Sequence, residues 1–232
     1  MQPYLFPYVG YLNLLSSVDT IVLRDRVKYS KGGWVNRNRL EIHDETNWLT
    51  LPLQKSSDFD LIGQKCISKD LQLESLRQKL HHGVLGFKYA KVAVGHFDSV
   101  FSEVKGLTAL FPLLRTSISS ISEILSLGTV VIAESELQAE NFSAGEEGVI
   151  EICKVLGASD YFNAPGGKNL YSPSSFRASG IGLWFVNPQL TVYERPGRNW
   201  HGGLSFLDGL AAVGVDSLSE LSRSDFFVSK EG

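Results

Sequence analysis

The sequence of 232 residues has little cysteine, almost no excess of charge and no long apolar run, and each deficit excludes a class of protein. Its two cysteines, Cys66 and Cys153, lie outside any metal or redox spacing, which argues against a disulfide framework and favours a cytoplasmic location. No apolar stretch approaches the roughly 20 residues that cross a bilayer, so we expect no membrane span. The net charge of −3 excludes a generally basic surface for nucleic acid.

Familiar catalytic and metal-binding motifs are also missing from the sequence. The glycines follow neither the Walker nor the Rossmann spacing, no G-x-S-x-G sequence occurs, and the histidines lack the spacing of zinc ligands, so we predict no metal site. His201 has two interpretations, a general base or a polar loop residue. No resident cofactor follows from the sequence.

Apolar periodicity switches repeatedly between the helical and the strand pattern. We predict helices over residues 7–16, 143–156 and 172–179, buried strands over 20–23, 129–133, 160–164 and 181–186, and a hairpin from 40–42 and 47–53. Apolar stripes make residues 68–127 a helical middle segment, and Ser143 and Glu146 have the spacing of a capping box. The alternation predicts one α/β domain over residues 1–232, with a mainly parallel sheet flanked by helices.

In sheets of this kind, ligand sites lie in the loops beyond the carboxyl ends of the strands. The loops Arg24–Arg39 and Asn163–Tyr171 each follow a predicted strand, so we expect them to share a cleft. Asp25 comes directly after the first of these strands and is our candidate for a weak general base.

The first loop gathers basic, amide and aromatic side chains around Gly32-Gly33. Arginine forks bind phosphate or carboxylate groups, and aromatic rings can stack on a base or a sugar. The candidate ligand-binding residues in this loop are Tyr29, Lys31, Trp34, Asn36, Arg37 and Arg39. The alternative is a solvated hairpin turn anchored by one tryptophan, and composition alone does not decide between the two.

The second loop places a Gly-Gly turn between a strand and a helix. Backbone amides at such a turn can bind an anion or an oxyanion, which makes Asn163, Gly166, Gly167 and Tyr171 candidate binding residues. A tight turn without any ligand is the alternative interpretation.

The opening stretch is rich in tyrosine and proline, and Gln2, Tyr4, Tyr8 and Tyr11 offer amide and hydroxyl groups to a cleft. The sequence Tyr8-Val-Gly-Tyr11 stands where class-I-type nucleotidyltransferases carry His-x-Gly-His. Tyrosine in place of both histidines removes the groups that steady a phosphoryl transition state, so adenylyl transfer is a weaker alternative that rests on analogy.

Several motifs together resemble the WbqC-like proteins of bacteria. They are Met-Gln-Pro-Tyr-x-Phe-Pro-Tyr-x-Gly-Tyr at residues 1–11, Gly-Trp-x-Asn-Arg-Asn at 33–38, Trp-Leu-Thr-Leu-Pro at 48–52, Glu-Ile-Cys-x-x-Leu-Gly-Ala at 151–158, Asn-x-x-Gly-Gly-x-x-Leu-Tyr at 163–171 and Leu-Ser-x-x-Asp at 204–208. The resemblance covers nearly the whole chain, and the motifs occur in the same order as in the family. It implies a role in surface-polysaccharide biosynthesis, because such proteins occur with genes for O-antigen and capsule, with a proposed part in the amide decoration of amino sugars.

Residues and resemblance together favour an acyl- or aminoacyl-transferase acting on a nucleotide-linked amino sugar, with an activated acyl or aminoacyl donor. In this hypothesis Lys31, Arg37 and Arg39 hold phosphates, Tyr29 and Trp34 stack on the base or sugar, and the Gly166 and Gly167 amides polarise a carbonyl. The alternative is a non-catalytic module that binds a nucleotide sugar or another anionic small molecule, or that scaffolds a glycan-assembly complex.

Overall fold

The computed structural model describes residues 1–104, 106, 108–137, 142–189, 193, 195, 198, 202–224 and 226–231. Its helices are α1 (Val9–Ser16), α2 (Leu73–Val84), α3 (Ala90–Glu103), α4 (Leu110–Ile124), α5 (Gly145–Val155), α6 (Pro173–Ala178) and α7 (Phe206–Ser224). Its strands are β1 (Thr20–Leu23), β2 (Arg37–Ile42), β3 (Glu45–Thr50), β4 (Val130–Ala133), β5 (Asp160–Asn163), β6 (Gly182–Pro188) and β7 (Phe226–Glu231). Short 3-10 turns are η1 (Ile62–Gln64), η2 (Glu134–Glu136) and η3 (Pro165–Leu170).

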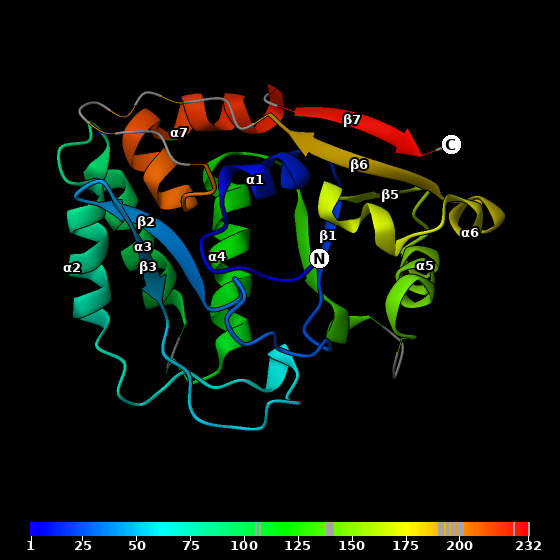
Figure 1. Cartoon of the computed structure of the whole chain (residues 1–232), viewed down its shortest axis with the longest axis horizontal. Helices are drawn as coiled ribbons and strands as arrows, with labels where there is room; N and C mark the ends of the chain where they lie inside the picture. Colours follow the sequence, from blue (N-terminus) through cyan, green and yellow to red (C-terminus); the bar gives the residue numbers. More distant parts are fainter. Residues whose placement is uncertain are drawn as a thin grey trace.

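The strands form three small sheets with helices packed beside them (Figure 1). β1 pairs with β4 in parallel, β5 pairs with β6 in parallel, and β7 extends the latter pair in the antiparallel direction. β2 and β3 make an antiparallel hairpin, as the alternating apolar pattern predicts. The predicted α/β class, with parallel pairing flanked by helices, is confirmed.

The helical middle segment is confirmed as α2, α3 and α4. Their apolar stripes bury Leu80, Phe97 and Leu114 in the larger of two cores, which also contains Tyr11 and Leu23. A smaller core lies between the β5–β6 pair and helices α5 and α6. Among the described residues, none of the helices combines the length and the apolar character that crossing a membrane requires.

Two local predictions were wrong. Ser143 does not form a capping box with Glu146, because its amide and hydroxyl both bond to Glu151, while the Glu146 carboxylate accepts the amide of Ser172. The turn predicted at residues 165–167 continues as the 3-10 helix η3, since Pro165 fixes a helical start. The sequence analysis also did not find β7, which pairs at the edge of β6.

Candidate functional site

The carboxyl ends of the parallel strands β1 and β4 carry charged side chains that bond across the pair. Arg24, just after β1, makes a 2.5 Å ion pair with Glu134, just after β4. Asp25 is buried, and its Oδ1 accepts the amide of Ser135 at 3.1 Å. This edge is therefore fixed by polar contacts between two strands that are far apart in the sequence.

A cleft of about 940 Å³ opens between β1 and the β5–α5 unit. Its walls include β1, β5 and apolar residues of α5, and Arg24 and Asn163 line it at the carboxyl ends of the two strands. Six residues selected from the sequence line it, namely Gln2, Tyr4, Asn163, Gly166, Gly167 and Tyr171. The prediction that two strand-end loops meet at one cleft therefore holds for Arg24 and for Asn163–Tyr171, but residues 28–39 are not among the lining residues.

The tyrosines of the opening stretch occupy different environments. Tyr4 and Tyr8 are half-buried, and burial raises the pKa of both phenols, so each hydroxyl stays a neutral hydrogen-bond donor. Tyr11 is fully buried in the larger core, where its hydroxyl donates to the carbonyl of Gln2 at 3.2 Å. Tyr4 therefore lines the cleft, whereas Tyr11 lies in the core and holds the backbone of the opening stretch at Gln2.

Gly167 is required by the packing of the cleft wall. A Cβ there would lie 2.4 Å from Nδ2 of Asn163 and 3.2 Å from the Tyr171 ring, and both of those residues line the cleft. The Gly167 amide already donates to the carbonyl of Ala164 at 3.0 Å, so it is not available to an oxyanion.

Replacement of Gly167 by alanine should therefore destabilise the protein by about 1–3 kcal/mol, since overpacking displaces Asn163 and Tyr171. Gly166→Ala is the matched control, because a Cβ there meets nothing within 4 Å. We expect this control to stay within about 0.5 kcal/mol of the native protein in urea unfolding. Equal effects of the two substitutions would contradict the packing role.

Part of the predicted basic loop has a structural role. The hydroxyl of Tyr29 donates to Asn36 Oδ1 at 2.7 Å, and Asn36 Nδ2 donates to the carbonyl of Leu51 at 2.8 Å. Asn36 is buried, and these bonds tie the loop to the end of β3. Lys31 is exposed at the tip of the loop.

The remaining loop residues form an arginine–tryptophan ladder with Trp48 of β3. The guanidinium of Arg37 lies 4.0 Å from the Trp48 ring centre, and that of Arg39 lies 5.2 Å from Trp48 and 4.5 Å from Trp34. The two indole rings are 5.2 Å apart. Arg37 therefore lies over Trp48, and Arg39 lies against both indole rings, which also contact each other; all four side chains are half-buried. Trp48 was missed in the sequence analysis, although its register opposite Arg39 follows from the hairpin.

The opening segment joins the cleft to this ladder. Tyr4 lines the cleft, the amide of Leu5 donates to the carbonyl of Val35, and Tyr8 pairs with Ser205. Ser205 in turn donates its amide to the carbonyl of Arg39 at 2.9 Å. Because the chain spans at most about 3.6 Å per residue, the Cα atoms of Tyr4 and Tyr8 are no more than roughly 14 Å apart. The segment from Tyr4 to Tyr8 therefore contacts both the cleft and the hairpin that carries the ladder.

Of the two residues proposed for catalysis, only Asp25 is among the described residues. Asp25 is on the β1 edge next to the cleft but is not one of its lining residues. His201 lies outside the described residues. Cys153 lines the cleft from α5, and burial raises the pKa of its thiol to about 11, so the thiolate that a nucleophile needs is scarce at neutral pH.

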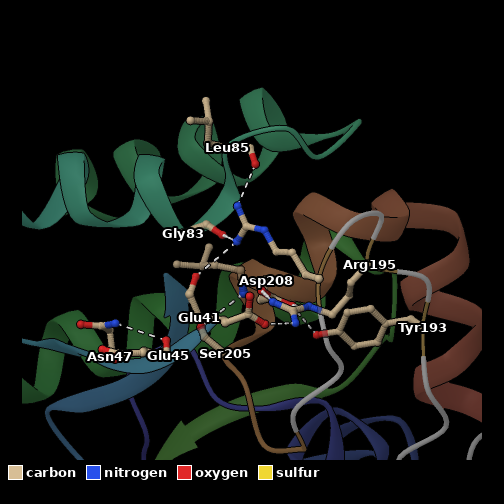
Figure 2. A network of polar contacts seen from close by, with 11 residues as sticks. Glu41, Glu45, Asn47, Gly83, Leu85, Tyr193, Arg195, Ser205 and Asp208 are labelled. Carbon is tan, nitrogen blue, oxygen red and sulfur yellow. Dashed lines mark hydrogen bonds and ion pairs between the residues drawn. The ribbon is translucent and has the colours of Figure 1, made fainter. Parts of the chain in front are cut away.

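Asp208 belongs to a buried ionic cluster with Arg195, Tyr193 and Glu41 (Figure 2). The Arg195 guanidinium reaches both Asp208 oxygens at 2.9 and 3.0 Å and also pairs with Glu41 of β2. The hydroxyl of Tyr193 donates to Asp208 Oδ1 at 2.6 Å. Burial raises the pKa of Asp208, although Arg195 opposes the shift. The cluster connects β2 to α7, and we assign it a structural role.

Comparison with known families matches residues 2–220 to the WbqC-like protein family. The chain belongs to that family. The WbqC-like chain is also similar to the uncharacterized protein Rv1507c of Mycobacterium tuberculosis, with 25% identity over 224 residues that cover 94% of each protein. No solved structure matches it.

Three of the WbqC-like motifs meet in this structure. The buried Asn38 amide donates to the carbonyls of Leu5 and Phe6 at 3.0 and 2.8 Å, and the Ser205 hydroxyl donates to the same Phe6 carbonyl. The opening sequence, the Gly-Trp-x-Asn-Arg-Asn sequence and the Leu-Ser-x-x-Asp sequence are thus hydrogen-bonded to one another. Their side chains hold the segment that runs between the cleft and the ladder.

Proposed function

We propose that this protein is an acyl- or aminoacyl-transferase that modifies the amine of a nucleotide-linked amino sugar in bacterial surface-polysaccharide biosynthesis. The observation that carries the proposal is the arrangement of two different surfaces along one short segment. One is a cation–aromatic ladder suited to a nucleotide diphosphate, and the other is a cleft with amide and hydroxyl groups suited to a sugar. Family membership is compatible with this role.

In the proposed complex, Arg39 and Arg37 hold the phosphates and Trp34 stacks on the base. Gln2, Tyr4, Asn163 and Tyr171, which line the cleft, offer hydrogen bonds to the sugar. Arg39 is suited to an anion because, within the described part of the chain, its guanidinium has stacking contacts but no hydrogen bond to a carboxylate.

The proposed reaction needs little chemistry from the protein. The sugar amine attacks the carbonyl carbon of an activated acyl donor, a C–N bond forms, and the donor's leaving group departs with its electron pair. The proton lost by the nitrogen passes to a weak base, for which Asp25 is our candidate because it lies at the β1 edge beside the cleft. Binding then contributes mainly by orienting amine and donor.

A mass-spectrometric assay tests this reaction. The protein would be incubated with a UDP-linked amino sugar and a set of thioester and aminoacyl donors, and the nucleotide sugar would be searched for the added mass of an amide. The proposal expects that product with the native protein and its loss in Tyr4→Phe with Asn163→Ala. Binding of the sugar without any product would favour the non-catalytic module, and release of diphosphate from ATP would favour the nucleotidyltransferase alternative.

Arg39→Ala should abolish the stabilisation that nucleotide sugars give to the protein. A ligand at 100 times its dissociation constant stabilises the native state by about 2.7 kcal/mol, which a thermal-shift measurement resolves easily. Arg177→Ala is the control, because Arg177 is an exposed arginine on α6, outside the ladder. If the Arg39 variant showed the same ligand-induced rise in melting temperature as the native protein, the phosphates would not bind at this loop.

A further inference from the structure

The ladder holds two positive charges close together. Arg37 and Arg39 are two residues apart on β2, so their side chains leave the same side of the strand with Cα atoms roughly 6.5–7 Å apart. Trp48, opposite Arg39 on β3, stacks with both guanidinium groups, whereas Trp34 stacks with Arg39 alone. Trp48 is therefore the one ring in the ladder that contacts both cations.

Neither guanidinium has a carboxylate partner among the residues that the structure describes. Arg37 donates Nε to the carbonyl of Gly33 at 2.9 Å and Nη2 to that of Gly32, so its plane is fixed by the glycine turn. The Arg39 guanidinium lies against both indole rings. Acidic residues outnumber basic ones by three in this chain. The two neighbouring arginines therefore form a positively charged site on a protein whose net charge is negative. Such a pair is complementary to a ligand with two adjacent negative groups.

We propose that Trp48 is a positioning residue that holds Arg37 and Arg39 as a pair for the diphosphate of the nucleotide ligand. The proposal rests on the function proposed above and adds a specificity for diphosphates over monophosphates. A single phosphate engages one guanidinium fork, whereas neighbouring phosphates engage both forks, provided that the two planes keep their relative orientation. Trp48 maintains that orientation because it stacks on both.

Binding of UDP, UMP and uridine, measured by isothermal titration calorimetry, tests the role of Trp48. The native protein should bind UDP at least about tenfold more tightly than UMP. Trp48→Leu should bring the two affinities to within about twofold of each other, and Trp48→Phe, which keeps an aromatic face, should restore most of the difference. Trp184→Leu is the matched control, since Trp184 also carries a cation, Lys230, 4.9 Å above its ring but lies on β6.

A second variant covers the case in which Trp48→Leu does not fold. Arg39→Lys keeps the charge but loses the planar fork, and it should reduce the preference for UDP to the same extent. A preference for UDP that survives both substitutions would overturn the role of Trp48 while leaving the proposed function intact. Failure of the native protein to bind UDP or UMP at all would overturn the proposed function and this inference with it.

Discussion

Replacement of Arg195 by alanine should lower the free energy of unfolding by about 3–5 kcal/mol. The Arg195, Glu41 and Asp208 side chains are only 1%, 0% and 0% exposed, so the substitution would leave two carboxylates in the interior without their cation. Figure 2 shows both carboxylates around this guanidinium, with the Tyr193 hydroxyl bonded to Asp208. Urea unfolding, followed by circular dichroism, measures the change.

The exposed ion pair between Arg77 and Asp98 provides the control for this prediction. Its side chains are 41% and 42% exposed, so water and salt already screen the attraction. Arg77→Ala should therefore leave the unfolding midpoint close to that of the native protein. A small effect of Arg195→Ala, comparable to that of Arg77→Ala, would show that the buried cluster does not hold β2 to α7.

The protein should also lose about 3 kcal/mol of stability as the pH falls from 6.5 to 4, because of one histidine. His96 on α3 is buried against the rings of Phe6 and Phe206, and burial lowers its pKa from 6.5 to about 4. Between pH 6.5 and 4 this histidine is therefore protonated in the unfolded chain but largely neutral in the folded protein. A base with a depressed pKa contributes stability above the unfolded value of 6.5, and this contribution disappears as the pH falls towards the folded value.

The comparison of native protein with His96→Phe isolates this contribution, since phenylalanine keeps a ring in the same site. The variant should lack the stability loss between pH 6.5 and 4, whereas replacing the exposed His82 should leave it unchanged. Asp208 acts in the opposite direction, because its raised pKa adds stability at low pH that is lost as the pH rises through the folded-state value. Identical pH profiles for the native protein and His96→Phe would contradict the assignment.

The elements of the fold were largely predictable because local patterns decide them. The strand at 20–23 is a short β-branched run, and the middle helices have apolar stripes with a 3.6-residue period, so burial alone selects their structure. The Ser143 capping box failed because Glu151, one to two turns into α5, competes for the same donors. β7 was missed because its strand conformation depends on pairing with β6, which the local sequence pattern does not indicate.

The site was predictable in part, for a related reason. Asn163 was selected because it ends a predicted strand, and it does line the cleft. Gln2 and Tyr4 were selected for their polar groups in the opening stretch, and both also line the cleft. The ladder depends on which side of the hairpin each residue faces, so Trp48 looked like an ordinary strand residue in the sequence. Asn36 and Tyr11 resembled ligand-binding residues but bond to the backbone, and only tertiary contacts reveal such roles.

Hydrogen–deuterium exchange with a UDP-linked amino sugar tests most directly whether the cleft and the ladder form one site. We predict protection in residues 2–8, 34–39 and 163–171 together, and with UDP alone protection in residues 34–39 but not in 163–171. Protection of both regions by the full ligand would support a nucleotide on the ladder and a sugar in the cleft. Protection confined to other segments, or none at a saturating concentration of ligand, would contradict this account.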